Sequence, residues 1–295
     1  MGEIADAIRR VRTQGLDAIA NPERAPIGLR PSLSALSPPA PLAAPAPQLP
    51  KAGHRVDRVE SVHPAVVLDD GPNAEACRHV ALRLRSAMEA RGARSTVIVS
   101  AERGDGKTTV ACNLAIALAT LSRGRDVALV DLDLRKPSVG SYLSLSGGAG
   151  IEAVLLGKAT LDSVRVEVEN PAIDVYPAVT PQRAAHELLV LPQLGELIGL
   201  LERRYAAVII DTPPAPIVPD ANLILRHVAA CVPVVRAGKT RARSFRRLVD
   251  CLPRTQLAGW ILNCDRSSAR AYGYYYYGAE PVRSAKTRRY WGGAK

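Results

Sequence analysis

The chain has 295 residues, 47% of them hydrophobic, so it can bury a substantial core, and its net charge is +11. The charge is concentrated at residues 9–12, 239–247 and 283–295 without an RNA- or DNA-binding motif, so we interpret it as a solvated basic surface with no specific nucleic-acid partner. No run of about 18 apolar residues, no signal peptide and no CxxC pair occurs, which argues against a membrane span, secretion and a metal or disulfide framework.

Composition divides the chain into four segments. Residues 1–20 have apolar side chains at near-helical spacing and predict a short N-terminal helix. Residues 21–70 form a linker that is rich in Pro and Ala, for which we expect disorder. Residues 71–265 carry the patterns of a folded domain, and residues 266–295 form a basic tail rich in tyrosine.

Within the folded domain, strand and helix patterns alternate in chain order. The predicted helices lie at residues 74–91, 107–121 and 185–204. The predicted strands are short apolar runs at residues 95–100, 127–131, 173–178, 207–211, 230–235 and 259–263. Apolar strands separated by helices indicate an α/β fold, in which a mostly parallel β-sheet is flanked by helices on both faces.

A phosphate-binding loop lies between the first strand and the next helix. The segment SAERGDGKTT fits the Walker A pattern with Ala101 in place of the first glycine, in the strand–loop–helix context that the motif requires. Its backbone N–H groups and the helix N-terminus would surround phosphate oxygens, so the chain is predicted to have a P-loop NTPase fold that binds ATP and Mg²⁺. The predicted nucleotide-binding residues here are Arg103, Gly104, Asp105, Gly106, Lys107, Thr108 and Thr109.

Carboxylates end two other predicted strands. Asp131 and Asp133 follow the apolar run VALV at i, i+2 spacing, and Asp211 ends the run AVII, as in a Walker B motif. The carboxyl ends of parallel strands are where α/β folds bind ligands. We therefore expect Lys107 and these three carboxylates to be catalytic, with Thr108, Asp133 and Asp211 as the Mg²⁺ ligands.

These motifs together resemble those of the bacterial tyrosine kinases (BY-kinases) of capsule and exopolysaccharide synthesis, relatives of the MinD/ParA ATPases. The resemblance covers about residues 74–277 and rests on SAERGDGKTT, VALVDLDLRKPSV and VIIDTPP. It implies a protein-tyrosine autokinase, in which Asp131 is the base that takes the tyrosyl proton. It also implies that Asn263, at the end of the last strand, contacts the nucleotide base.

The tail supports this resemblance with a cluster of tyrosines that such kinases phosphorylate on a neighbouring subunit. The segment YGYYYY follows the last predicted strand and has no apolar periodicity, so it is poorly explained as core. The predicted phosphoacceptors are Tyr272, Tyr274, Tyr275, Tyr276 and Tyr277.

The resemblance also implies partners. Stand-alone members of the family are activated by a membrane adaptor of the polysaccharide co-polymerase type, which would recruit the kinase to the inner face of the membrane. A homo-oligomer is expected as well. The family's Glu-x-x-Arg-x-x-Arg motif is only partly present, however, because Glu75 and Arg78 fit it but position 81 is Ala.

Two alternatives remain at this point. A MinD/ParA-like ATPase switch without kinase activity would explain the basic segments, although Glu102 occupies the position of that class's additional lysine. A regulator that binds nucleotide without transferring phosphate is the other, and the intact carboxylates argue against it.

Overall fold

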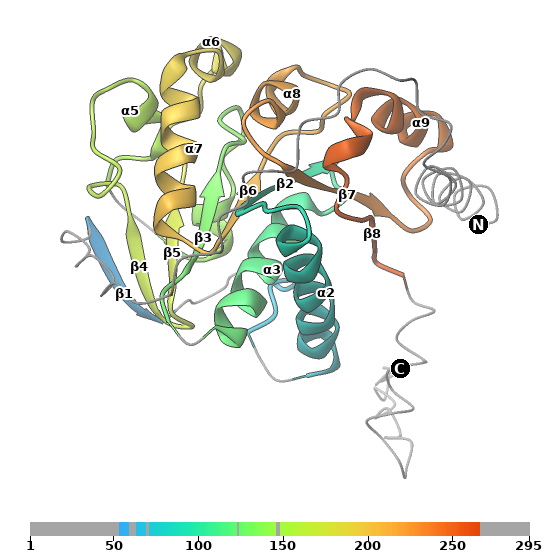
Figure 1. Cartoon of the computed structure of the whole chain (residues 1–295), viewed down its shortest axis with the longest axis horizontal. Coiled ribbons are helices and arrows are strands. Elements are labelled where there is room, and N and C mark those ends of the chain that lie inside the picture. Colours follow the sequence, from blue (N-terminus) through green and yellow to red (C-terminus); the bar gives the residue numbers. More distant parts are fainter. Residues whose placement is uncertain (1–52, 59–62, 69–70, 123, 146–147, 266–295) are drawn as a thin grey trace, which may run out of the picture.

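The computed structural model describes residues 53–58, 63–68, 71–122, 124–145 and 148–265, which form an α/β fold around a single sheet (Figure 1). The strand order is β1-β4-β5-β3-β6-β2-β7-β8, and all neighbouring strands are parallel except the antiparallel pair β4 and β5. The strands are β1 His54–Arg58, β2 Ser95–Ser100, β3 Val127–Asp131, β4 Val166–Asn170, β5 Ile173–Tyr176, β6 Ala207–Asp211, β7 Ala230–Arg236 and β8 Ile261–Asn263.

Helices cover both faces of this sheet. They are α2 Pro72–Glu89, α3 Lys107–Leu121, α4 Val139–Tyr142, α5 Ile151–Leu155, α6 Ala185–Leu189, α7 Pro192–Arg204, α8 Asp220–Leu225 and α9 Ala242–Cys251, followed by the 3₁₀ turn η2 Arg254–Gln256. One apolar cluster joins α2 and α3 to the sheet, and a second joins α5 to α9 to the opposite face. No helix in the described ranges is long and apolar enough to cross a membrane.

The predicted fold class is confirmed, and three predicted strands have the same limits as β2, β3 and β6. These strands lie at the centre of the sheet, where both faces are covered and every residue is buried. Burial on both faces produces the continuous apolar runs that made the strands recognisable in the sequence.

Two strands at one end of the sheet, the edge strand β1 and its neighbour β4, were not predicted. β1 lies inside residues 21–70, which we expected to be a linker, and β4 lies in a stretch that the sequence left without an element. β1 is largely exposed, and β4 alternates buried with partly exposed residues. Neither strand therefore contains the continuous apolar run that a central strand requires.

The predicted helix 185–204 is two helices, because Pro192 is the first residue of α7. A proline disfavours helical backbone angles in the residue that precedes it, and Leu191 adopts an extended conformation with ψ 146°. The apolar periodicity continues through this break and conceals it in the sequence.

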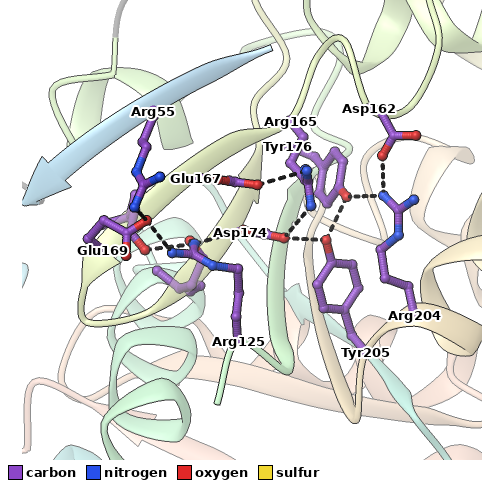
Figure 2. A network of polar contacts seen from close by, with 12 residues as sticks. Arg55, Arg125, Asp162, Arg165, Glu167, Glu169, Asp174, Tyr176, Arg204 and Tyr205 are labelled. Atoms are coloured by element: carbon purple, nitrogen blue, oxygen red, sulfur yellow. Dashed lines mark hydrogen bonds and ion pairs between the residues drawn. The ribbon is translucent and has the colours of Figure 1, made fainter. Parts of the chain in front are cut away.

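A buried polar network fastens the β4–β5 side of the sheet, and Figure 2 shows its members. Asp174 accepts hydrogen bonds from Arg125 at 2.9 Å, from Arg165 at 3.3 Å and from the Tyr205 hydroxyl at 2.6 Å. The hydroxyls of Tyr205 and Tyr176 are 2.7 Å apart. Buried charges are tolerated where they are paired, and these contacts hold β5 against the ends of β3 and α7.

Candidate nucleotide site

The P-loop connects β2 to α3 at the carboxyl edge of the sheet. Gly104 and Gly106 have φ angles of 82° and 94°, a region that glycine enters without the steric cost of a side chain. A Cβ at position 106 would also overlap the amide of Asn263. The two predicted glycines therefore permit a backbone path that other residues would strain.

Lys107 and Thr108 begin α3 and lie inside the loop. Lys107 is only 8% exposed, and the Thr108 hydroxyl donates a 2.6 Å hydrogen bond to Oδ2 of Asp211. Of the other predicted nucleotide-binding residues, Arg103 is exposed and Thr109 is half-buried in the first turn of α3. The structure thus brings the Walker A helix and the Walker B strand into direct contact.

Asp211 has an oxygen that suits a cation. Its Oδ1 atom is buried and has no hydrogen-bond partner among the described residues. Burial raises the pKa of Asp211 to about 6, while Lys107 and the Thr108 hydroxyl lower it. In the described ranges no group of three or more His, Cys, Asp or Glu side chains could hold a metal alone. Mg²⁺ at nucleotide sites commonly has one or two carboxylates together with substrate phosphates, and the oxygen donors present here fit that pattern.

Asp131 stands opposite Asp211 in the register of β3 and β6 and is fully buried. Its Oδ2 accepts hydrogen bonds from the backbone N–H groups of Ser138 and Val139, and its Oδ1 accepts one from Asp133. Both oxygens of Asp131 are thereby occupied in shaping the loop that follows β3. Asp131, which the sequence led us to expect as the base, therefore lies at the site with both oxygens bonded to backbone N–H groups.

Asp133 is partly exposed in that loop, and one of its oxygens accepts a hydrogen bond from the Lys136 backbone. Burial raises the pKa of Asp133 most, and the charges of Lys107 and Arg103 lower it. Asp133 therefore lies within electrostatic reach of two cations of the P-loop. It is the accessible carboxylate of the predicted pair.

The end of β7, the loop that follows it and the end of β8 form hydrogen bonds to the P-loop. Thr240 donates a 2.8 Å hydrogen bond to the buried carboxylate of Asp105, and Arg236 donates one of 3.1 Å to the Gly104 carbonyl. The Asn263 side-chain amide donates to the Asp105 carbonyl at 2.9 Å. Asn263, predicted to contact the base, thus lies directly against the P-loop.

Sequence reasoning did not identify Arg236, Thr240 or Asp220 as residues of this site. Asp220, in α8, forms a bidentate ion pair with Arg135 of the loop after β3, with contacts of 2.7 and 3.0 Å. For Arg135 its place in the DLDLR segment was a signal. For Arg236, Thr240 and Asp220, the sequence showed only that they follow a predicted apolar strand. Many surface residues do so as well, so this position did not identify them as residues of the site.

The predicted phosphoacceptors lie outside the described residues. The residues of the partial oligomerisation motif lie within them, on α2, where Arg78 donates a 2.8 Å hydrogen bond to Glu75 of the same helix. That pairing links the two matching members of the motif to each other within the chain.

Comparison with known proteins identifies the class to which this fold and site belong. Residues 96–268 match the CobQ/CobB/MinD/ParA nucleotide binding domain family. The chain is 33% identical over 210 residues to tyrosine-protein kinase YwqD of Bacillus subtilis, a match that covers 69% of this chain and 86% of YwqD. Within the CobQ/CobB/MinD/ParA class, the chain therefore belongs to the bacterial tyrosine-protein kinase family, as the motifs suggested.

Other relatives place the match in context. The chimerical protein CapA2B2 superimposes with a TM-score of 0.63 at 25% identity, over 72% of this chain and 92% of that structure. Tyrosine-protein kinase wzc of Salmonella typhi is much longer, and this chain, at 29% identity, spans 29% of its length. The shared part is thus the nucleotide-binding domain and its immediate surroundings.

Proposed function

We propose that the chain is an autokinase that transfers the γ-phosphate of Mg-ATP to the tyrosine cluster at residues 272–277 of a neighbouring copy. The observation that carries the proposal is the carboxylate of Asp133, which is partly exposed after β3 while the carboxylates of its neighbours Asp131 and Asp211 are fully buried. The charge of Lys107 lowers the pKa of Asp133, so this cation acts on it. A phenol needs both a base and a nearby cation in order to attack a phosphoryl group. The names of the relatives support a tyrosine as the acceptor.

The transfer would proceed with these residues in stated roles. A tyrosyl oxygen forms a bond to the γ-phosphorus, the bond from that phosphorus to the β–γ bridging oxygen breaks, and ADP leaves. The phenolic proton passes to the carboxylate of Asp133. Lys107 and the backbone N–H groups of the P-loop offset the negative charge on the phosphate oxygens.

Asp131 then acts as a positioning residue, since its two oxygens hold the backbone on which Asp133 is carried. This assignment moves the base from Asp131, favoured by the family resemblance, to its neighbour. The reason is access, because a fully buried carboxylate that accepts three backbone hydrogen bonds is poorly placed to receive a proton from a phenol.

Thr108 and Asp211 would hold the Mg²⁺ ion together with the nucleotide phosphates. Asp133, which the sequence led us to expect as a third ligand, is here assigned the role of base instead. When bound, the ion supplies positive charge at the β- and γ-phosphate oxygens. The protein's own contribution is orientation, because the hydrogen bond between Thr108 and Asp211 directs the free Oδ1 atom of Asp211. Arg103, Gly104, Asp105, Gly106, Thr109 and Asn263 are proposed to complete the nucleotide contacts.

A partner and a place in the cell follow from the relatives. CapA2B2 is a chimerical protein, and its name combines two components, which supports a membrane adaptor as activator of this chain. We propose recruitment to the inner face of the membrane by that adaptor, and a role in capsule or exopolysaccharide synthesis or export. A homo-oligomer is required for transfer between neighbouring copies.

Phosphosite mass spectrometry after incubation with Mg-ATP, with and without a candidate adaptor, tests the proposal. Wild type should carry phosphotyrosine at residues 272–277, and Asp133→Asn should carry none while it still binds Mg-ATP. A variant with all five tyrosines replaced by Phe should also carry none. Mixing this variant with Asp133→Asn should restore modification, because one supplies the active site and the other the tail.

Two outcomes would redirect the proposal. Loss of phosphotyrosine in Asp131→Asn with full activity in Asp133→Asn would return the role of base to Asp131. ATP hydrolysis in wild type without any phosphotyrosine would favour the MinD/ParA-like switch. In that case ATP should instead control binding to a membrane or to DNA.

A further inference from the structure

Helix α9 presents a row of arginines to solvent. Arg243, Arg246 and Arg247 are exposed, whereas Phe245 and Leu248 on the opposite side are buried in the core. Among the residues that the structure describes, none of these three arginines forms an ion pair or a side-chain hydrogen bond. We call this surface the α9 arginine face.

The arginines at the opposite end of the sheet, near β4 and β5, have carboxylate partners. Arg125, Arg165 and Arg204 each bind at least one carboxylate (Figure 2). These side chains stabilise the fold through their partners, and a guanidinium with a carboxylate partner is not available to a ligand. The α9 arginine face differs from them, because it groups three arginines without a carboxylate partner among the described residues on one side of a ten-residue helix.

The stability of helix α9 does not explain why three arginines lie on one side of it. Arg243 and Arg247 are four residues apart, so two like charges lie side by side on the helix. Arg243 is also in the first turn, where a positive charge opposes the helix dipole. The acidic residue of α9, Asp250, is exposed and forms no ion pair with these arginines in the described part of the chain. The arginines are therefore left uncompensated, and they point to an anionic ligand.

The position of α9 suggests which anion. The helix lies between β7 and β8 in the chain, and the tail of residues 266–295 follows β8 directly. Tyr272 and Tyr277 are seven and twelve residues beyond Asp265, which an extended chain spans over about 23 to 40 Å. The end of β8 lies beside the loop that leads into α9, because the N–H of Ala237 donates a 2.9 Å hydrogen bond to the carbonyl of Asn263. Ala237 is only five residues before the first residue of α9, so the cluster can reach this helix of its own chain.

We propose that the tyrosine cluster, once phosphorylated, docks on the α9 arginine face of the same chain. This inference rests on the proposed function, since phosphorylation creates the ligand. Each phosphotyrosine carries about −1.5 to −2 charges, and guanidinium groups bind phosphate with paired hydrogen bonds. The unmodified cluster is uncharged and has no comparable attraction for the arginines.

Docking in this way would end a cycle of transfer. A tail held on its own chain is withdrawn from the active site of a neighbour, so a modified subunit ceases to be a substrate. The loop that precedes α9 also braces the P-loop, through Thr240 to Asp105 and through Arg236 to Gly104. The docked tail would thus lie close to the element that holds the nucleotide.

A synthetic peptide tests the docking without any need for kinase activity. Fluorescein-labelled peptides of residues 266–281, with the five tyrosines either phosphorylated or unmodified, would be titrated into unphosphorylated full-length protein and followed by anisotropy. The phosphopeptide should bind at least about tenfold more tightly than the unmodified peptide, and its affinity should fall with salt. The peptide ends before the basic residues that begin at Arg283, so they cannot neutralise it.

Two variants locate the binding surface. Arg243→Glu/Arg246→Glu/Arg247→Glu should weaken phosphopeptide binding at least about tenfold, and the corresponding Gln variant should lie between it and wild type. The control is Arg83→Glu/Arg85→Glu, because these two arginines are exposed on α2, and it is compared with Arg243→Glu/Arg247→Glu, which changes the charge equally. Melting curves should show that all variants are folded. Equal losses in the α9 and α2 variants would overturn the assignment.

A tail phosphorylated by peptide ligation tests docking within one chain. Full-length protein that carries this tail should bind the free phosphopeptide at least about tenfold more weakly, at all protein concentrations. Unchanged binding would show that the tail does not occupy α9. Binding to vesicles that contain anionic lipid is measured as well. If the protein binds these vesicles through α9 and does not bind the phosphopeptide, the α9 arginine face is a membrane-binding surface instead. The docking experiments use synthetic phosphopeptide and need no kinase activity. The docking proposal and the kinase proposal can therefore fail separately.

Discussion

At the scale of single residues, the site contains buried polar side chains, among them Lys107 and Asp211. Asp211 binds Thr108 with one oxygen and leaves the other without a protein partner. Lys107 lies within the loop and lowers the pKa of both Asp211 and Asp133. Each of these groups is costly to bury alone, and a bound Mg-nucleotide would complete the set.

Replacing Lys107 should weaken Mg-ATP binding. In Lys107→Met the main cationic contact with the β- and γ-phosphates is lost, and charge-assisted hydrogen bonds are worth about 1.5–3 kcal/mol, so affinity should fall about tenfold or more. Calorimetric titration measures the affinity for Mg-ATP. Lys158→Met is the control, because Lys158 is an exposed lysine. Unchanged affinity in Lys107→Met would remove the basis of the Walker A assignment.

Acidification should have opposite effects on binding and on stability through Asp211. Burial raises its pKa from 3.8 to about 6, so protonation as the pH falls through 6 should weaken Mg-nucleotide binding. In the nucleotide-free protein, the stability that protonated Asp211 contributes is fully present below about pH 4 and is lost as the pH rises through 6.

Titration calorimetry and thermal melts between pH 5 and 8 measure the two effects. Asp211→Asn should bind Mg-nucleotide weakly throughout and show less pH dependence of melting than wild type. If wild-type affinity is as high at pH 5 as at pH 7.5, Asp211 is not a cation ligand of the kind proposed.

At the scale of elements, polar contacts hold the sheet and its loops in the arrangement that the site requires. Arg135 and Asp220 join α8 to the loop after β3, and Thr240 joins the loop after β7 to the P-loop. On the other side of the sheet, the network around Asp174 joins β5 to α7 (Figure 2). Because these contacts are buried or nearly so, each should contribute more to stability than an exposed pair.

Tyr205→Phe tests this difference. The substitution removes the hydroxyl that donates to Asp174 and lies 2.7 Å from that of Tyr176, so the free energy of unfolding should fall by about 1–3 kcal/mol. Arg55→Gln is the comparison, because the Arg55 side chain is 66% exposed in its ion pair with Glu169 and should cost less than about 1 kcal/mol. Urea denaturation measures both variants, and equal losses would contradict the ranking.

At the scale of the whole molecule, one folded domain carries the nucleotide site, and the long segments at its two ends carry the remaining predicted features. The domain accounts for the matches to the tyrosine-protein kinases. The tyrosine cluster and the Pro/Ala-rich segment are known only from the sequence. Their predicted roles, as substrate and as linker, can be separated by deletion.

Deleting residues 32–50 should leave the melting temperature within about one or two degrees of wild type. A segment so rich in proline buries little apolar surface, so its removal should cost the domain little. The strand β1 begins only at His54 and remains in the deleted chain. A loss of many degrees would show that the segment packs on the domain.

The sequence by itself determined the fold class, the central strands and the P-loop, because each depends on a local pattern. Apolar runs mark strands that are buried on both faces, and the Walker A spacing marks a loop whose geometry is set by neighbouring residues. The same local patterns placed Asp131, Asp133 and Asp211 at the carboxyl edge of the sheet and led to the correct family.

Only the tertiary structure decided how these carboxylates differ in burial and in hydrogen bonding. In the sequence, Asp131 and Asp133 both look like carboxylates at the end of a strand. In the structure, the backbone N–H groups of Ser138 and Val139 donate hydrogen bonds to Asp131, whereas the carboxylate of Asp133 stays partly accessible. The contact of Thr240 with Asp105 joins residues 135 positions apart. Such contacts follow from the order in which strands assemble into a sheet, which a local pattern does not contain.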